Sequence, residues 1–543
     1  MSDSRPDAIV VGAGLAGLVS TLELLRSEHT VLLLDRCLPH ELGGLAREAF
    51  GGMFMVDSPE QRRSRIRDSE RLALEDWLRI ADFDAEDVWP RRWAEQYVTR
   101  ARDDVGSWLR EIGVKFFPVV NWAERGNFGD GNSVPRFHLT WGTGKALVQA
   151  VWGAIESHPR RSALEVRFET KVVELLLDGG VADGVRLESG DELRAAKAVV
   201  LASGGIGGNL EIVRREWPTE RLGPAPEELL MGSHYYADGA MHEEVRRVGG
   251  NITHLSRMWN YADAVHHPKP QRERHGLKLI PPRSGLMLSP DGERYGPVPV
   301  IPTFDAYAAL ERMCEDERKY SWLICNFKIA KRELDVSGSQ HNPHLRERRL
   351  LPFLLSVLLG KPSLVRHFLE GSPDFVCASS LAGLAAEMNE VTGEGAIHAS
   401  VLEREVGRYD ETIARGKGLF NDDQLRRIEQ LRNWRGDRLR TARFQRIVDP
   451  KAGPLIAIRL QPMARKSLGG IQTDLSCRVL REARDPIEGL YCVGEAAGFG
   501  GGGVHGKRSL EGTFLGGCVF TGRLAAASIA GAELPVRIPP RID

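Results

Sequence analysis

The residues with the clearest chemistry lie near the start of the chain, in the run Gly12-Ala13-Gly14-Leu15-Ala16-Gly17. Gly12 permits a tight turn, Gly14 lets a pyrophosphate approach the backbone, and Gly17 lets a helix pack closely on a strand. Asp35 follows the first glycine by 23 residues, where a carboxylate can hydrogen-bond a ribose hydroxyl. The residue types and their spacing therefore indicate a dinucleotide site.

A strand–helix–strand unit must position these residues, and the sequence predicts one. Ala8 to Val11 is an apolar run typical of a buried parallel strand, and a helical pattern covers Leu18 to Leu25. A second apolar run, Thr30 to Leu34, leads to Asp35. The helix N-terminus would present free N–H groups to the phosphates. A glycine motif alone is weak, but the whole unit favours a dinucleotide site over an ordinary turn.

Length and composition limit the interpretation. A chain of 543 residues is too long for one core and predicts two or three domains. The formal net charge of −1, without long runs of one sign, argues against a nucleic-acid partner. Seven cysteines without a CxxC pair argue against a zinc site and a disulfide framework, and they suit a reducing cytoplasm.

A cytoplasmic location is also favoured by the absence of targeting and membrane signals. The first strand begins by residue 8, which leaves no room for a cleavable signal peptide. The longest apolar stretch, Leu350 to Leu359, has ten residues and contains Pro352, so it is too short to span a bilayer. With the basic residues before it, this stretch predicts a buried helix; peripheral docking on a membrane surface is the alternative.

Further glycine-rich segments suit the same ligand. Gly43-Gly44 and Gly51-Gly52 would let the backbone pass close to a bulky planar group, with plain turns as the alternative. Residues 116–144 are aromatic, glycine-rich and irregular, as expected of a loop that lines a ligand site. Ala202-Ser203-Gly204-Gly205 follows a predicted strand at 198–201 and would also approach the dinucleotide.

The C-terminal part returns to the pattern of the first residues. Gly489 to Val493 predicts a buried strand, with Gly494-Glu495 at its tip. A small-residue helix from Thr513 onward would point its N-terminal N–H groups at a developing negative charge. Between the two parts, residues 260–445 contain many prolines and long helical stretches, and we expect a second domain there.

These motifs resemble the FAD-binding fold shared by fumarate reductases, succinate dehydrogenases and 3-ketosteroid dehydrogenases. The resemblance is carried by GAGLAG with Asp35, the two glycine pairs, LASGG and GLYCVGEAAG. More narrowly, VDSPEQRRSRIRDS, NSVPRFHLTWGTG, ARKSLGGIQTDL and GFGGGGVHGKRSLEGTFLGG look like a bacterial branch of FAD-binding dehydrogenases. The resemblance covers nearly the whole chain.

The resemblance implies an α/β fold with two domains. One would be a Rossmann-like FAD-binding domain of the glutathione-reductase type, formed by residues 1–260 and 445–543. The other would be an inserted α+β substrate cap, residues 261–444. Leu45 stands where relatives with covalent FAD carry a histidine, so the FAD should be bound non-covalently.

The resemblance also implies which residues bind FAD. Gly12, Gly14 and Gly17 would hold the pyrophosphate, Asp35 would bind the adenosine ribose, and Val172 would meet the adenine through its backbone. The glycine pairs would border the pyrophosphate and the isoalloxazine ring, while the later segments would contact the ribityl chain and the flavin N1 and O2. The residues predicted to bind FAD are Gly12, Gly14, Ala16, Gly17, Asp35, Arg36, Gly43, Gly44, Gly51, Gly52, Val172, Ala202, Gly204, Gly205, Gly494, Glu495, Gly512, Thr513 and Leu515.

Departures from the family pattern concern the substrate. Lys466 stands where fumarate reductases carry a histidine before their late TMGG. Ser509 takes the place of the arginine of their NRLGG motif, and Arg508 lies one position earlier. This altered dicarboxylate clamp speaks against fumarate or succinate. The late tyrosine that enolises the ketone in ketosteroid dehydrogenases is not evident, so the resemblance fixes the cofactor better than the substrate.

Four side chains are candidates for catalysis. Lys466 and Arg508 lie in glycine-rich motifs near the flavin and could polarise a carbonyl or bind a carboxylate, with surface or phosphate-facing cations as the alternative. His505 could relay protons, although a loop histidine satisfied by the backbone is favoured. Tyr295 is a candidate from the cap, although an ordinary turn is favoured. His266-His267 lacks a cluster of partners, so no metal site is predicted.

The sequence thus predicts an FAD-dependent oxidoreductase that transfers hydride between flavin N5 and a C–C bond next to a carbonyl. Its predicted substrate is a cyclic, largely apolar ketone such as a steroid. The alternative is a fumarate-reductase-like reduction of a small unsaturated carboxylate, favoured if Lys466 and Arg508 both face the pocket. A third class, a flavin-binding protein without small-molecule turnover, would be favoured by a large exposed apolar patch around residues 350–359.

The electron acceptor is predicted to be a separate molecule. Gly204-Gly205-Ile206-Gly207-Gly208 does not match a second GxGxxG motif, and a CxxC pair is missing. Both observations argue against a pyridine-nucleotide disulfide reductase. We therefore expect electrons to pass to a quinone, a redox protein or oxygen.

Overall fold

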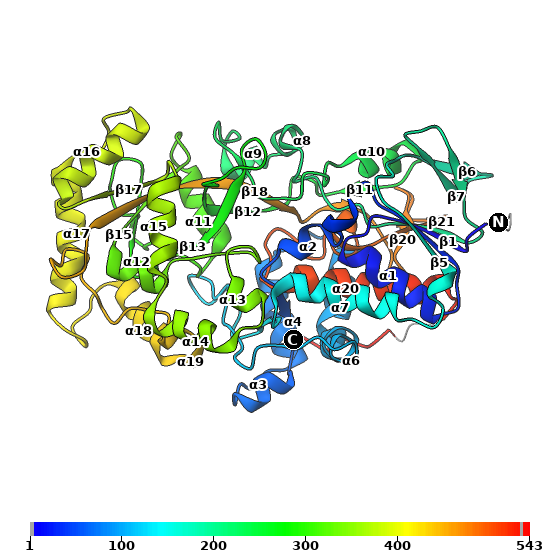
Figure 1. Cartoon of the computed structure of the whole chain (residues 1–543), viewed down its shortest axis with the longest axis horizontal. Helices are drawn as coiled ribbons and strands as arrows, with labels where there is room; N and C mark the ends of the chain where they lie inside the picture. The colour runs from blue at the N-terminus through cyan, green and yellow to red at the C-terminus, as the bar shows by residue number, and fades with distance from the viewer. Residues whose placement is uncertain (1–4, 533–535, 543) are drawn as a thin grey trace.

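A six-stranded sheet carries the glycine-rich motif (Figure 1). The computed structural model describes residues 5–532 and 536–542. The strand order is β20-β21-β9-β1-β2-β5, and all neighbours are parallel except β20 and β21. The strands are β1 (Ala8–Val11), β2 (Val31–Leu34), β5 (Leu164–Arg167), β9 (Ala198–Leu201), β20 (Arg478–Leu480) and β21 (Pro486–Cys492). The predicted strands at both ends of the chain are confirmed.

Three helices cover one face of this sheet, and a small antiparallel sheet covers the other. The helices are α1 (Leu15–Arg26), α7 (Thr143–Glu156) and α20 (Thr513–Ile529), and the small sheet consists of β6 (Val172–Asp178), β7 (Val181–Leu187) and β8 (Glu192–Arg194). Ala8 and Val10 pack in the core under the helices, whereas Ile9 and Val11 pack in the core with β6 and β7. The alternation follows because successive residues of a strand point to opposite faces.

The second sheet has eight strands and is built around β18, which pairs with four neighbours. The central order is β14-β15-β18-β12-β13-β16, and β10 and β17 also pair with β18. The strands are β10 (Leu230–Met231), β12 (Met258–His266), β13 (Gly276–Ile280), β14 (Leu286–Leu288), β15 (Ser321–Asn326), β16 (Asp335–Val336), β17 (Phe375–Ala378) and β18 (Leu455–Ser467). The domain boundaries at 260/261 and 444/445 remain a prediction, and β18 connects the two predicted parts.

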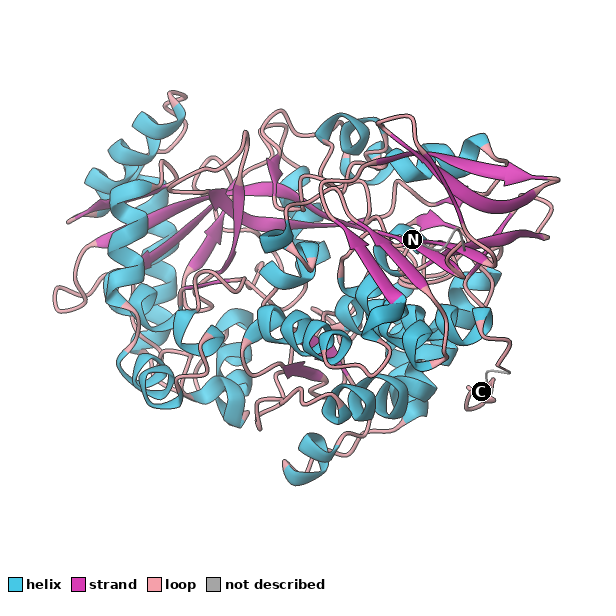
Figure 2. Ribbon diagram, turned by 45° about the vertical axis from the view of Figure 1, so that its right-hand side comes forward, coloured by secondary structure: helices cyan, strands magenta, loops and turns pink. Residues whose placement is uncertain are grey.

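Helices pack around the second sheet, and Figure 2 shows most of the helices of the molecule on one side of the strands. They are α11 (Ala306–Cys314), α12 (Phe327–Glu333), α13 (Pro343–Arg346), α14 (Leu350–Leu359), α15 (Pro362–Gly371), α16 (Leu381–Thr392), α17 (Ala399–Ala414), α18 (Asp423–Asn433) and α19 (Arg435–Arg438). Trp322, Phe368 and Tyr409 are fully buried in this core.

The prediction of a buried helix at residues 350–359 is wrong. These residues do form a helix, α14, but none of them is buried. An apolar composition makes burial of the helix favourable, but it does not determine whether other elements pack around the helix on every side. The part of the chain that the structure describes holds no helix both long and apolar enough to cross a membrane.

The other helices and short strands join these parts. They are α2 (Gly44–Glu48), α3 (Pro59–Arg63), α4 (Glu70–Ala81), α5 (Val88–Arg100), α6 (Trp108–Glu111), α8 (Leu210–Arg215), α9 (Thr219–Leu222), α10 (Ala240–Arg247), the pair β3 (Gly52–Phe54) and β4 (Phe137–Leu139), and the pair β11 (Ile252–Thr253) and β19 (Gly470–Ile471). The segment 116–144 is largely irregular, as expected, and only β4 and the start of α7 are regular.

Candidate functional site

A cavity of about 570 Å³ extends from the glycine-rich motif to the helices of the second sheet. Its lining includes Gly14 at the start of α1, Lys466 of β18 and Phe353 of α14. The loop 116–144 contributes Phe117 and Leu139, among others, so its predicted role in lining a ligand site agrees with its position.

Small residues form the wall of the cavity near the six-stranded sheet. We call this set the glycine wall: Gly14, Gly43, Gly51, Gly52, Ala202, Gly204 and Gly512. A Cβ atom added to Gly14 would have no protein atom nearer than 4.0 Å, so the space beside this backbone belongs to the cavity. The segment can therefore accept a bulky ligand directly against its main chain.

Gly12 and Gly17 support this wall from behind and do not line the cavity. Gly12 has φ +107°, and a Cβ atom there would lie 2.5 Å from the carbonyl oxygen of Ala202. A Cβ atom on Gly17 would lie 1.9 Å from the carbonyl oxygen of Gly12. Both glycines are therefore required by backbone packing between β1, α1 and β9.

Two helices begin at the glycine wall with their N-terminal N–H groups free of side-chain caps. Gly14 is the N-cap of α1 and Gly512, with φ +98°, is the N-cap of α20. Uncapped N–H groups and the positive end of the helix dipole favour a phosphate or another anionic group. Walls of small residues, together with two helix N-termini, fit a flavin dinucleotide.

Asp35 lies beside the glycine motif, as predicted. Its Oδ2 accepts the N–H of Ala13 at 2.5 Å, and its Oδ1 accepts the N–H of Cys37 at 2.7 Å. Arg36 instead pairs with Asp238 at 2.8 Å, and Val172 is a buried residue at the start of β6. Neither Arg36 nor Val172 lines the cavity, and their roles toward FAD remain predictions.

The later predicted residues surround Glu495, which is half-buried and lines the cavity. Glu495 Oε1 accepts the N–H of Ser467 at 3.0 Å, and burial raises the pKa of Glu495 to about 7. A Cβ atom on Gly205 would lie 2.5 Å from Glu495 Oε1, so Gly205 makes room for this carboxyl. Gly494, with φ +64°, packs against Ala16.

The predicted FAD residues fall into two groups. Those that line the cavity are Gly14, Ala16, Gly43, Gly51, Gly52, Ala202, Gly204, Glu495, Gly512 and Leu515, and those that lie behind it or beside it are Gly12, Gly17, Asp35, Arg36, Gly44, Val172, Gly205, Gly494 and Thr513. Leu45 also lines the cavity and offers no nucleophile for a covalent bond to FAD.

A cluster of charged and hydroxyl groups forms another part of the wall. We call the set Tyr261, Asp263, Lys278, Lys466 and Glu511 the charged cluster; all five line the cavity. The hydroxyl of Tyr261 donates to Glu511 Oε1, and Lys466 Nζ donates to the Tyr261 oxygen at 3.2 Å. Lys278 Nζ donates to Asp263 Oδ2 at 3.2 Å. Antiparallel pairing of β12 with β18 brings Tyr261 and Lys466 together.

Burial and mutual charge set the ionisation of the cluster. Burial lowers the pKa of Lys466 to about 8, against the opposing charge of Glu511. Burial by itself would raise the pKa of Glu511, but the charges of Lys466 and Lys278 and the hydrogen bond from Tyr261 outweigh it and hold this pKa below its usual value. Burial and the Glu511 charge raise the pKa of Tyr261. At neutral pH the cluster therefore presents a carboxylate, a neutral phenol and an ammonium group.

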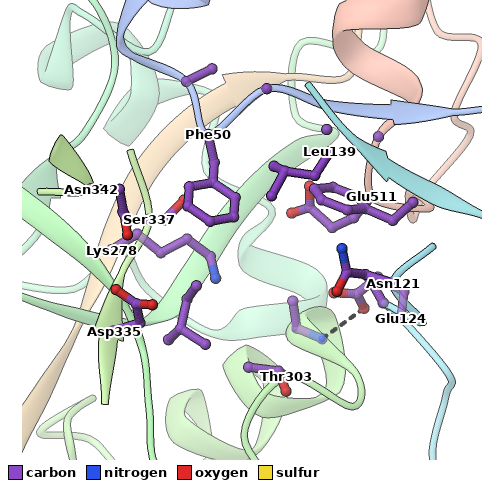
Figure 3. A pocket seen from close by; sticks show the side chains of 18 of the residues that line it. Phe50, Asn121, Glu124, Leu139, Lys278, Thr303, Asp335, Ser337, Asn342 and Glu511 are labelled. Carbon is purple, nitrogen blue, oxygen red and sulfur yellow. Dashed lines mark hydrogen bonds between the residues drawn. The ribbon is translucent and has the colours of Figure 1, made fainter. Parts of the chain in front are cut away.

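Figure 3 shows Lys278 and Glu124 facing the same space from opposite sides, with Phe50 and Leu139 nearby. Glu124 accepts the N–H of Ala306 at 3.0 Å. Burial, and then the charges of Asp305 and Glu511, raise the pKa of Glu124 well above its usual value. This shift favours the protonated form of Glu124, which can donate a hydrogen bond into the cavity.

Of the four predicted catalytic residues, only Lys466 lines the cavity. Arg508 pairs with Asp305 and Asp130, Tyr295 shares a hydrogen bond of 2.7 Å with Ser321, and His505 shares one of 2.8 Å with Thr513. Burial lowers the pKa of His505 to about 3, so it stays neutral. Each of these three side chains has a structural partner outside the cavity, and their catalytic roles remain predictions.

Tyr261, Glu511 and Lys278 line the cavity but were not among the predicted site residues. Glu511 lies inside the motif GKRSLEGTFLGG. Within this motif Arg508 was predicted instead, because it lies one position before the place of a family arginine. Tyr261 lies in the apolar context MWNYADAVH, which reads as a buried strand. The register of β12 on β18 brings Tyr261 close to Lys466, and this register cannot be derived from the sequence alone.

His266, from the pair His266-His267, has carboxylate partners. It pairs with Asp374 at 2.8 Å, and hydrogen bonds to Asp374 and Glu228 raise its pKa to about 9. The described residues contain no group of three or more histidine, cysteine, aspartate or glutamate side chains placed to hold a metal ion.

Comparison with known proteins shows the family to which the chain belongs. The family described as "FAD binding domain" matches residues 7–515. A KsdD-like steroid dehydrogenase of Mycobacterium tuberculosis is 45% identical over 96% of this chain and 95% of its own length. The solved 3-ketosteroid delta1-dehydrogenase from Sterolibacterium denitrificans, in complex with 1,4-androstadiene-3,17-dione, has a TM-score of 0.68 at 16% identity, over 97% of this chain and 100% of that one.

A flavocytochrome c3 fumarate reductase has a TM-score of 0.66 at 19% identity, over 97% of this chain and 78% of that one. At such identities the two solved structures show the fold alone. The fold expected from the sequence is confirmed.

Proposed function

Because the chain belongs to the FAD-binding family that includes the KsdD-like steroid dehydrogenases, and is thus an FAD-dependent dehydrogenase, we propose that it desaturates a cyclic, largely apolar ketone. A 3-ketosteroid is the first substrate to test. The name of the relatives supports a steroid as the substrate class, and so does the chemistry of the side chains that line the cavity.

The observation that carries the proposal is the position of the charged cluster. Its polar groups line the same cavity as the glycine wall and as apolar side chains such as Ile280, Met287 and Val300, which form what we call the chamber. An apolar ring system would bury against these side chains, and a single carbonyl could reach a hydrogen-bond donor. A small dicarboxylate would leave the apolar chamber unfilled.

The proposed chemistry removes a proton and a hydride from adjacent carbons. FAD, held by the glycine wall, supplies the hydride acceptor. Glu511 accepts the proton from the carbon next to the carbonyl through Oε2, for which no described residue is a hydrogen-bond partner, whereas Oε1 accepts from Tyr261 and Trp259. The Lys466 ammonium and the Tyr261 hydroxyl keep Glu511 ionised, and either ammonium of the cluster can polarise the carbonyl oxygen.

The proposal retains Lys466 from the predicted catalytic residues and leaves out Arg508, Tyr295 and His505. The reduction of a small carboxylate would be favoured if both Lys466 and Arg508 faced the pocket, but Arg508 does not line the cavity and is paired with Asp305. We also propose a separate electron acceptor, which can be a quinone, a redox protein or oxygen, and a cytoplasmic setting. The seven cysteines, all free in the structure, support a reducing compartment.

Anaerobic reduction of the flavin tests the function. Cyclic ketones, including 3-ketosteroids, and small saturated carboxylates are added one at a time to the oxidised holoenzyme, and flavin absorbance is followed. Bleaching by a 3-ketosteroid and not by succinate supports the proposal. Bleaching by succinate alone, or reoxidation of the reduced enzyme by fumarate but not by an unsaturated ketone, contradicts it.

A further inference from the structure

Helix α14 exposes an unusually apolar surface. Its sequence, LLPFLLSVLL, contains no charged residue, and no residue of the helix is buried. Leu351, Leu355 and Leu358 are 73%, 54% and 55% exposed. Soluble surfaces rarely leave so many large apolar side chains side by side, and such patches mark interaction sites.

The inner side of the same helix lines the substrate cavity. Phe353, Leu354 and Val357 border the cavity. The ring of Phe353 packs against Phe117 at 5.4 Å and Trp141 at 6.0 Å between ring centres. Helix α14 is therefore a single layer between the cavity and the outside.

Arginines are concentrated just before α14 and in and after α19. Arg346, Arg348 and Arg349 precede α14 directly, and α19 with the residues after it adds four more, at positions 435, 438, 440 and 443. Figure 1 shows α14 and α19 together at the lower edge of the molecule, and both line the cavity. Three of these arginines have acidic partners, because Glu347 pairs with Arg346 and Arg349 and Asp335 pairs with Arg440, whereas Asp437 of α19 pairs with Arg125 and Arg283.

We propose that α14 and α19 form a surface that docks on an anionic lipid bilayer, with the leucines in the acyl boundary and the arginines at the phosphate level. An apolar helix of ten residues, about 15 Å long, lies in the interface rather than across the bilayer. Leu439, 46% exposed and also lining the cavity, extends the apolar surface toward α19.

A bilayer suits this surface better than a protein partner because its two chemistries match those of a lipid interface. Leucines complement acyl chains, and these arginines complement anionic headgroups at about 1 kcal/mol per charge, or roughly fivefold in binding. The docked cavity would then take its substrate directly from the lipid, where an apolar ketone concentrates. Only this last step rests on the proposed function; docking itself does not.

Vesicle co-sedimentation of the holoenzyme tests the docking. The probes are vesicles of phosphatidylcholine alone and of phosphatidylcholine mixed with phosphatidylglycerol. We expect wild-type protein to bind the mixed vesicles and to bind them less at high salt. The triple variant Leu351→Ser/Leu355→Ser/Leu358→Ser should lose at least tenfold in partitioning. Arg438→Gln and Arg443→Gln should each lose about fivefold.

Matched substitutions at other exposed positions serve as controls. Val181→Ser on β7 removes a 44% exposed apolar side chain, and Arg215→Gln on α8 removes an exposed arginine, both far from α14 in Figure 1. Both controls should bind vesicles like wild type. Full flavin content and unchanged flavin reduction by a water-soluble cyclic ketone would show that the triple variant is folded.

Failure of docking and failure of the proposed function give different results. If wild type does not sediment with anionic vesicles, or the triple variant sediments equally well, the docking proposal is wrong whatever substrate the enzyme takes. If wild type is a dimer and the triple variant is a monomer, the surface binds a second copy of the chain instead of a bilayer. If docking holds but no ketone bleaches the flavin, docking stands and the proposed substrate class fails.

Discussion

The glycine wall and the charged cluster border the same cavity, but they work through different parts of the chain. The glycine wall acts through main-chain atoms, and its residues are defined by the side chains they lack. The charged cluster acts through five side chains whose ionisation depends on one another. A wall of the first kind needs fixed backbone positions, whereas a wall of the second kind needs a fixed arrangement of charges.

This difference leads to distinct expectations for mutation. A side chain added to the glycine wall should impair cofactor binding or folding, since the new atoms occupy space needed by the ligand or the backbone. A side chain changed within the charged cluster should slow the chemistry while flavin stays bound. Measurements that separate flavin content from flavin reduction can therefore break or sharpen the comparison.

The largest effect is expected for Glu511→Gln. Loss of the proposed proton acceptor should slow flavin reduction by the ketone by about 10²- to 10⁴-fold, while flavin content stays close to wild type. Stopped-flow reduction under anaerobic conditions measures the first quantity, and the absorbance ratio of flavin to protein measures the second. Dithionite should reduce the variant at the wild-type rate. Loss of flavin from this variant would contradict a purely chemical role.

Two alanine substitutions in the glycine motif should differ in kind. In Gly17→Ala the new Cβ would meet the backbone oxygen of Gly12 at 1.9 Å, so the apoprotein should lose about 1–3 kcal/mol of stability, measured by denaturant unfolding. In Gly14→Ala the nearest protein atom lies at 4.0 Å, so the fold should be unaffected and FAD binding should weaken at least tenfold, about 1.4 kcal/mol. Equal losses of apoprotein stability in both would remove the distinction.

The pH dependence of flavin reduction should report on Lys466. Its pKa is lowered to about 8, so the ammonium is present below this pH and is lost as the pH rises through it. The rate should therefore be constant near neutrality and fall about tenfold per pH unit above about 8. Lys466→Arg keeps its charge to much higher pH, and its alkaline fall should move out of the accessible range. A rate that rises through pH 8 would assign the neutral amine as a base.

The smallest effect on the rate is expected for Arg508→Met. Arg508 pairs with Asp305, which also caps the N-terminus of α11 by accepting the N–H of Ala308 at 2.9 Å. Thermal unfolding should shift downward because a largely buried carboxylate loses its partner, but flavin reduction should change less than about threefold. Lys466→Met should show the opposite pattern. A rate loss in Arg508→Met as large as in Lys466→Met would restore Arg508 as a catalytic candidate.

The glycine wall could be predicted from the sequence, and the charged cluster for the most part could not. Turns that need positive φ restrict Gly512 to one residue type, and close packing behind the wall does the same for Gly12 and Gly17, so these residues leave a local pattern in the sequence. Tyr261 and Lys466 are about two hundred positions apart and meet only through the pairing of β12 with β18. Such a contact depends on strand register and leaves no local pattern.

Helix α14 marks another limit of sequence reasoning. Its existence follows from composition, but the sequence predicted burial, whereas the structure leaves α14 exposed and buries most of the apolar helix α20. α20 packs against α1 and β3, whereas α14 lines the cavity on one side and has exposed leucines on the other. Apolarity therefore predicts that a surface will be covered, and tertiary structure decides whether the protein itself covers it.

Strand β18 decides how the molecule can be divided into fragments. It runs for thirteen residues, about 40 Å, and is the common partner of β10, β12, β15 and β17. A polypeptide of residues 261–444 would lack this central strand and would leave the edges of β12 and β15 open to aggregation. A fragment made to express the cap by itself must therefore include residues 455–467. Lys466 would then be part of the cap fragment and not of the fragment that contains the glycine motif.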